Sequence, residues 1–175
     1  IGDGANRLVL DAYQQLRSLY PEGLLRIEHA QIVHLDDLHR FAELNVIPSV
    51  QPVHCVSDAA MAVTRLGPAR CRTAYRWRSL LETGVPLIGG SDFPIESPDP
   101  RVGIAAFIDR RAVGSTHPWY PDETIDPDSA VRAYTEWAQR GVPGTSPRGR
   151  LEPGYDADIV VVDGDPLDGG EIVAT

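Results

Sequence analysis

An aspartate directly follows an apolar segment in the middle of the chain, where a carboxylate can take part in metal or proton-transfer chemistry. Residues 87–90 are short, apolar and without alternation, which is typical of a strand buried on both faces of a parallel sheet. Ser91 and Asp92 come next, and Pro94 prevents the strand from continuing. Barrel enzymes hold catalytic groups at the C-terminal ends of such strands. The alternative is that Asp92 only caps the following turn.

Polar side chains also follow two other predicted strands. The strand at 24–28 is followed by His29, and the strand at 46–50 is followed by Gln51 and His54. The C-terminal ends of parallel strands open on the same face of a barrel. The side chains of His29, Gln51 and His54 are therefore expected to lie at the same end of the sheet as Asp92.

An imidazole and a carboxylate brought together in this way suit a divalent metal site. His29 would supply a neutral nitrogen, and Asp92 would be an oxygen ligand or accept a proton from a water whose pKa the metal lowers to about 7. The alternative for His29 is a hydrogen-bonded structural histidine. Of the other histidines, His34 and His39 are expected to be solvated helix residues, and His117 stays undecided.

Strands and helices alternate along the chain, which predicts right-handed βαβ crossovers, a parallel sheet and an α/β fold. After a boundary at 141–149 that is rich in Gly and Pro, a last strand at 156–163 is expected to have no partner nearby in the chain. The predicted strands cover 24–28, 46–50 and 86–90, and the predicted helices cover 5–20, a segment capped by Asp36 or Asp37, 59–65, 73–82, 102–112 and 126–139.

Composition excludes several classes of protein. The chain has 175 residues and 42% hydrophobic residues, enough for one domain with a core. Its net charge of −9 argues against nucleic acid as a partner, and no apolar run reaches the roughly 18 residues that a membrane span requires. All 16 basic residues are arginine.

The two cysteines and the first residues also carry information. Cys55 and Cys71 lack the spacing of a zinc site or a disulfide framework, which favours free thiols and a cytoplasmic location. The chain opens on Ile-Gly-Asp-Gly without an initiator Met, so it is expected to be part of a longer protein.

Several segments, taken together in order and spacing, resemble the amidohydrolase superfamily over nearly the whole chain. The branch that they resemble is the YtcJ-like group, with N-substituted formamide deformylases and AepA-like exoenzyme regulatory proteins. The segments are 1–6 (IGDGAN), 26–31 (RIEHAQ), 49–52 (SVQP), 74–81 (AYRWRSLL), 90–96 (GSDFPIE), 149–154 (GRLEPG) and 157–161 (ADIVV).

The resemblance implies the C-terminal part of a TIM (β/α)8 barrel followed by the beginning of a small β-sandwich. Residues 1–140 would be the last βα units of the barrel, 141–150 a linker, and 151–175 the segment that returns to the sandwich. The superfamily's first-strand His-x-His pair and bridging lysine are absent from this chain, and its fifth-strand His would lie just before residue 1.

The resemblance also implies roles for individual residues. His29 would be the metal ligand of the sixth barrel strand, and Asp92 the metal ligand and catalytic proton shuttle of the eighth. Gln51 and His54 would contact the substrate. Tyr75 belongs to a signature, shared with Trp77 and Arg78, whose role is unassigned; helix spacing favours packing for the two aromatic residues.

These expectations describe the C-terminal part of a metal-dependent amidohydrolase that hydrolyses an amide or another non-peptide C–N bond of a small molecule. The cofactor would be a divalent metal, expected to be zinc, held by the longer protein. The chain alone is expected to be inactive and to associate with a second copy or with the missing N-terminal half. The alternative is a non-catalytic regulatory or interaction protein that retains the fold, and an intact His-x-His in the parent would favour the enzyme.

Overall fold

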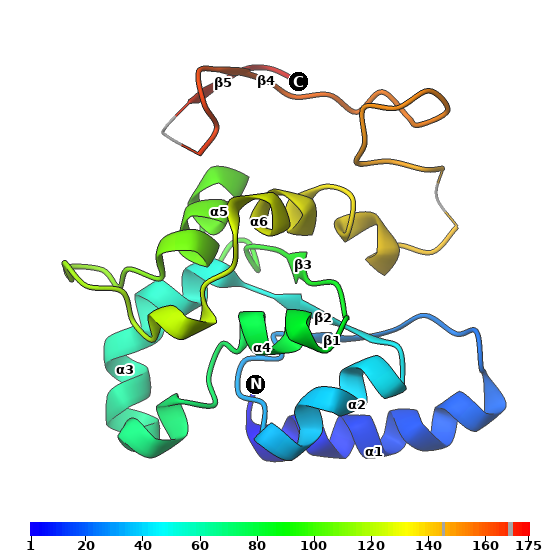
Figure 1. Cartoon of the computed structure of the whole chain (residues 1–175), viewed down its shortest axis with the longest axis vertical. Helices are drawn as coiled ribbons and strands as arrows, with labels where there is room; N and C mark the ends of the chain where they lie inside the picture. Colours follow the sequence, from blue (N-terminus) through cyan, green and yellow to red (C-terminus); the bar gives the residue numbers. More distant parts are fainter. Residues whose placement is uncertain (145, 168–169) are drawn as a thin grey trace.

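A three-stranded parallel sheet forms the centre of the fold in the computed structural model, which describes residues 1–144, 146–167 and 170–175 (Figure 1). The strands are β1 (Leu25–Glu28), β2 (Val46–Val50) and β3 (Ile88–Gly89), in that spatial order. Leu25 lies opposite Val46, and Ser49 lies opposite Ile88. The predicted parallel sheet and its strand positions are therefore confirmed, although β3 is shorter than expected.

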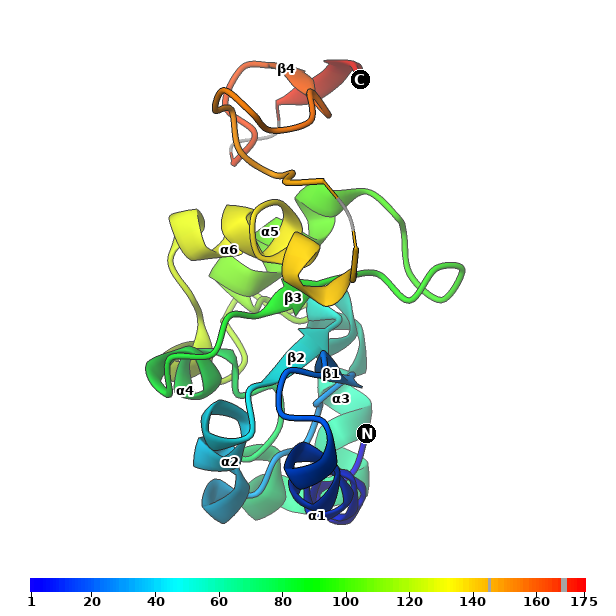
Figure 2. The same ribbon diagram turned by 90° about the vertical axis from the view of Figure 1, so that its right-hand side faces the viewer.

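Helices connect the strands and surround the sheet. Figure 2 shows α1 and α2 on one side of the parallel sheet and α5 and α6 on the other. α1 packs against β1, α2 against β2 and α6 against β3. The α-helices are α1 (Asp3–Leu19), α2 (Leu38–Glu43), α3 (Pro52–Cys71), α4 (Trp77–Glu82), α5 (Pro100–Asp109) and α6 (Pro127–Tyr134), and the short 3-10 turns are η1 (Leu35–Asp37), η2 (Pro121–Glu123) and η3 (Ala138–Gly141).

Three of the predicted helices differ clearly in extent from those observed. The helix expected at 126–139 ends at Tyr134, and a separate 3-10 turn, η3, follows it. The helix expected at 59–65 is α3, which begins at Pro52 because proline is well suited to the first turn of a helix. The same helix is kinked at Gly67, whose φ is 73°. The helix expected at 73–82 begins only at Trp77, because Tyr75 adopts the left-handed region with φ 52°. The structure thus places His54 in the first turn of a helix and not at a strand end.

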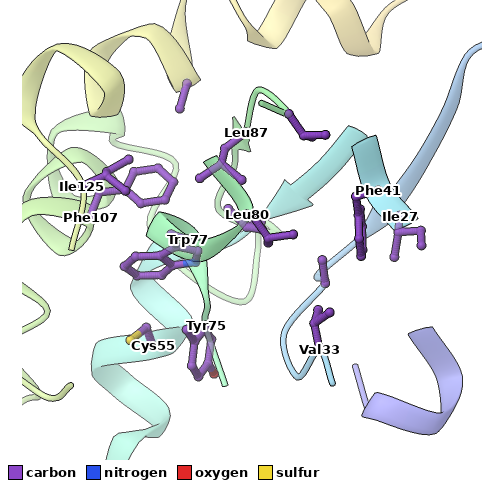
Figure 3. Close-up of a cluster of buried hydrophobic side chains, with 14 of the residues drawn as sticks. Ile27, Val33, Phe41, Cys55, Tyr75, Trp77, Leu80, Leu87, Phe107 and Ile125 are labelled. Atoms are coloured by element: carbon purple, nitrogen blue, oxygen red, sulfur yellow. The ribbon is translucent and has the colours of Figure 1, made fainter. Parts of the chain in front are cut away.

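Large apolar side chains from residues between Leu10 and Trp137 form one core (Figure 3). Phe107 packs edge-on against Trp77, with ring centroids 4.8 Å apart. Tyr134 of α6 lies over Gly89 of β3 and Gly103 of α5, and a methyl group at Gly89 would lie only 2.6 Å from its ring. This close approach fixes α6 directly against the strand that precedes Asp92.

A hairpin follows the α/β region. β4 (Val161–Asp163) pairs antiparallel with β5 (Glu171–Ala174), so the expectation that the last strand has no nearby partner was wrong. Figure 1 shows the hairpin beyond α5 and α6, apart from the parallel sheet. Arg101 at the start of α5 ties it to the fold by donating to the carbonyl oxygen of Gly170 at 2.8 Å.

Two expectations from composition can be compared with the structure. Cys55 and Cys71 are buried free thiols, as predicted. Within the described ranges, no helix combines the length and the apolar character that a bilayer crossing requires.

Candidate metal centre

Three side chains converge at the C-terminal end of the parallel sheet. His29 follows β1, Asp92 follows β3, and His54 lies in the first turn of α3, directly after β2. Each offers one potential ligand atom, and these atoms all lie within 4.8 Å of one another. Three neighbouring strands therefore each contribute one group to a cluster that we call the His29–His54–Asp92 cluster.

The distances within the cluster confirm that His29 and Asp92 meet at the same end of the sheet. Nε2 of His29 lies 3.9 Å from Oδ2 of Asp92. The rings of His29 and His54 are stacked, with centroids 5.9 Å apart and planes 16° apart. His54 is buried, whereas the Asp92 side chain is 44% exposed, so the cluster is open to solvent on the carboxylate side.

The backbone is strained where it presents the cluster. His29, Ala30 and Asp92 have φ values of 68°, 40° and 55°, in the left-handed region that non-glycine residues rarely adopt. Conformations of this kind cost about 1–3 kcal/mol each and concentrate at functional sites. The Phe93–Pro94 peptide bond, next to Asp92, is cis.

The donor atoms of the cluster fit a divalent cation. Nδ1 of His29 and Nε2 of His54 are buried and have no hydrogen-bond partner among the residues that the structure describes. An unsatisfied buried polar atom costs about 1–3 kcal/mol, and a neutral imidazole nitrogen is a common metal ligand. Two imidazoles and one carboxylate match the three protein ligands of catalytic zinc sites, which leave a further position open.

The structure gives the two residues that were expected to contact substrate different positions. His54 belongs to the cluster, and Gln51 is a buried residue between the end of β2 and the start of α3. Sequence reasoning missed the ligand geometry of His54 because it treated the residue as part of a strand end. Pro52 was the available signal, since a proline that starts a helix places the residue two positions later in the first turn.

The loop after Asp92 is attached to the helix that carries His54. The Ser57 hydroxyl donates to Oε1 of Glu96 at 2.6 Å, and the amide of Ile95 donates to the carbonyl oxygen of Asp92 at 2.9 Å. These bonds connect the two flanks of the cluster.

A cavity of 470 Å³ lies elsewhere, near the start of β3, and none of the three cluster residues lines it. Its walls include Val85, Trp137 and Arg140. Because none of the cluster residues lines this cavity, we assign no chemistry to it.

The remaining histidines lie outside the cluster. His34 and His39 are exposed, as expected; Nδ1 of His34 accepts from the amide of Asp36, and His39 lies 3.9 Å from Glu43. His117 is exposed in the loop between α5 and η2.

Known proteins similar to this chain include amidohydrolases, which agrees with the metal-ligand geometry of the cluster. The sequence model of the "Amidohydrolase family" matches residues 1–171. The chain is 34% identical over 144 residues to the putative amidohydrolase YtcJ of Bacillus subtilis, covering 81% of this chain and 27% of the relative. It is 34% identical to the protein LONG AFTER FAR-RED 3 of Arabidopsis thaliana, in a match that covers 93% of this chain and 28% of the relative. It is 28% identical to the N-substituted formamide deformylase of Arthrobacter pascens, in a match that covers 96% of this chain and 31% of the relative.

Solved structures show the same relationship. Uncharacterized metal-dependent hydrolases from Pyrococcus furiosus and Pyrococcus horikoshii superpose with TM-scores of 0.79 and 0.82, at 36% and 34% identity. The matches cover 95% and 96% of this chain and 33% of each hydrolase. The chain therefore spans about a third or less of the length of these relatives.

Proposed function

The chain belongs to the amidohydrolase family, and on that premise we propose that it is part of a metal-dependent hydrolase. In this proposal His29, His54 and Asp92 hold a divalent metal ion, and the expected ion is zinc. The observation that carries the proposal is that one potential ligand atom of each of His29, His54 and Asp92 lies within 4.8 Å of the others. Among the described residues, Nδ1 of His29 and Nε2 of His54 are also buried without a hydrogen-bond partner. A purely structural histidine pair would have these nitrogens satisfied by protein groups.

The proposed reaction is hydrolysis of an amide or another non-peptide C–N bond in a small molecule. When bound, a divalent metal supplies Lewis acidity and lowers the pKa of a coordinated water molecule. His29 and His54 would hold the metal, since their rings are stacked on each other and the His54 ring is buried. Asp92, the most exposed of the three, accepts a proton at a carboxylate oxygen and returns it to the leaving amine.

The substrate class rests on one relative. The name of the Arthrobacter pascens protein, an N-substituted formamide deformylase, describes cleavage of an amide, which favours C–N over ester bonds for this chain as well. Gln51, buried beside the first turn of α3, remains our candidate for a substrate contact.

We also propose that the parallel sheet is the last part of a (β/α)8 barrel and that the hairpin belongs to a small β-sandwich. The support is the order β1-β2-β3 with a helical crossover after each strand, together with the separate antiparallel pair β4-β5. Closing a barrel requires further strands beside β1 and β3, supplied by the remainder of a longer chain.

The second candidate function is a non-catalytic regulatory or interaction role. The name of one relative, LONG AFTER FAR-RED 3, describes no reaction, although the chain is 34% identical to it. A protein of this kind would keep the fold and would not need a metal or Asp92.

The test uses the full-length protein. Metal content is measured after dialysis, and hydrolysis is assayed on a matched series of N-substituted formamides, acetamides and the corresponding formate esters. We expect stoichiometric divalent metal, activity that a chelator removes and that added Zn²⁺ restores, and preference for amides. A protein that retains no metal and hydrolyses none of the compounds would favour the regulatory alternative, and preference for esters would overturn the C–N assignment.

A further inference from the structure

The hydroxyl group of Tyr75 connects the two segments that carry the clustered histidines. It accepts a hydrogen bond from Nε2 of Gln31 at 2.6 Å, two residues after His29. It also lies 3.2 Å from the carbonyl oxygen of His54 and 3.2 Å from Oδ2 of Asp58, to which it can donate. One phenol thus bridges the end of β1 and the first turns of α3.

The backbone around Tyr75 strengthens the same connection. The amide of Tyr75 donates to the carbonyl oxygen of Gln31 at 2.6 Å, and the amide of Val33 donates to Thr73 at 3.0 Å. Ile32 and Ala74 form an antiparallel bridge between these bonds. The phenol is therefore placed by a short ladder that starts just beyond His29.

The backbone conformation of Tyr75 is unfavourable in free energy, and neighbouring residues hold it in place. It is 4% exposed and has a left-handed φ of 52°, which is costly for a bulky residue. Nη1 of Arg110 donates to the carbonyl oxygen of Tyr75 at 2.7 Å. The guanidinium group of Arg110 stacks on the ring of Trp77, 4.4 Å from its centroid, and Figure 3 labels Trp77 and Tyr75. Arg110 is completely buried and, among the described residues, forms no ion pair with a carboxylate.

The Tyr75 hydroxyl uses both its acceptor and its donor capacity here. It accepts from Gln31, and its single proton can be donated to the His54 carbonyl or to the Asp58 carboxylate. Any buried hydroxyl requires hydrogen-bond partners, but here the partners belong to the two segments that carry His29 and His54.

We propose that Tyr75 is a positioning residue that sets the relative placement of His29 and His54 and thereby the metal affinity of the cluster. The metal-affinity part of this inference rests on the proposed function. The positioning part does not, because the hydrogen bonds through Gln31 and the His54 carbonyl exist without a metal. The inference assigns a role to a residue of the 74–81 segment that sequence reasoning left to packing.

The test is the substitution Tyr75→Phe, which removes the hydroxyl and keeps the ring. Tyr134→Phe is the matched control, because Tyr134 is also a largely buried tyrosine whose pKa burial raises, but it lies on α6 against Gly89 and Gly103. Gln31→Met breaks the same bridge from its other side. The readouts are Zn²⁺ affinity, the visible spectrum of the Co²⁺-substituted protein, and amide hydrogen exchange across residues 29–33 and 52–58.

For Tyr75→Phe we expect about tenfold weaker Zn²⁺ binding, in the range found when partners behind metal ligands are replaced, together with a changed Co²⁺ spectrum and faster exchange in both segments. Gln31→Met should give the same changes, and the double variant should be no worse than either single variant, because both remove one shared bridge. Tyr134→Phe should leave affinity and spectrum unchanged even where it lowers thermal stability.

Two results would overturn the inference. One is a Tyr75→Phe protein with a lower melting temperature but the Zn²⁺ affinity and Co²⁺ spectrum of the wild type, which is the outcome of pure packing. The other is unchanged exchange in both segments. If the wild-type protein binds no divalent metal, the proposed function fails, and the exchange data still decide whether Tyr75 couples the two histidine segments.

Discussion

The ring of His54 is stacked on the ring of His29, with planes only 16° apart, although one residue follows a strand and the other lies in a helix. This stacking places two imidazoles with unsatisfied buried nitrogens beside the Asp92 carboxylate. His54 therefore has the position of a metal ligand, whereas the family resemblance alone suggested contact with substrate.

Replacing His54 by Ala tests which of these roles it has. If His54 is a ligand, the affinity for Zn²⁺ should fall more than about 100-fold. Replacing a residue that only hydrogen-bonds to a metal ligand already lowers metal affinity by about 10–100-fold, and losing the ligand itself should lower it further. His39→Ala is the control, since His39 is an exposed histidine on α2. Metal content and affinity are measured by dialysis and competition. Unchanged metal binding with a raised KM would return His54 to the role of a substrate contact.

Replacing Asp92 by Asn in the full-length protein should abolish turnover with little effect on the fold. An amide cannot accept a proton as a carboxylate does, and loss of such transfer costs about 10²–10⁴-fold in rate. Asp92 is 44% exposed, so the core is not disturbed. Asp36→Asn is the control, because Asp36 lies 3.4 Å from His34 in an exposed pair outside the cluster. A rate near that of the wild type would exclude proton transfer by Asp92.

The two cysteines should remain thiols, with different reactivity in the folded and unfolded protein. Burial raises the pKa of the Cys55 thiol to about 12, and only the thiolate reacts rapidly with disulfide reagents. At pH 8 without reductant, the native protein should react slowly at Cys55, and the protein in denaturant should show both thiols. Absence of free thiols in denaturant would mean that a disulfide joins them.

Asp126 should stabilise α6 as its N-cap. Its carboxylate accepts from the amide of Ser129 at 2.9 Å, and this hydrogen bond lowers the pKa of Asp126 below its ordinary value of 3.8. Asp126→Ala should reduce the free energy of unfolding by about 1 kcal/mol at pH 7. Asp128→Ala, at an exposed site in the same helical turn, is the control.

The effect of Asp126 should depend on pH in a defined direction. Because the folded-state pKa is depressed, the stabilisation is present above pH 3.8 and is lost as the pH falls through the folded-state value. Urea unfolding at several pH values measures this. A difference between wild type and Asp126→Ala that stays constant down to pH 2 would show that the cap does not act through the ionised carboxylate.

The sheet and two members of the cluster could be predicted because local sequence determines them. Apolar runs ended by polar residues and proline mark β2 and β3, and the strand-end rule then places His29 and Asp92 together. These features depend on a few neighbouring residues, so a single sequence is enough to find them.

The remaining features depend on contacts between distant residues. Tyr75 sits where local periodicity predicts a helix, but its left-handed backbone is held by Arg110 from the end of α5. The partner of β4 was missed for a different reason, since β4 and β5 form a hairpin of residues close in sequence. β5 has only four residues, all exposed, so it carries no buried apolar pattern that would mark it as a strand.

The packing of Tyr134 into the space above Gly89 and Gly103 has a consequence for evolution. A side chain at either glycine would collide with the ring, so these positions cannot enlarge independently. Among homologues, a larger residue at 89 or 103 should therefore occur with a smaller one at 134. The three positions would covary although none of them has a chemical role, because the Tyr134 ring occupies the space that a side chain at either glycine would need.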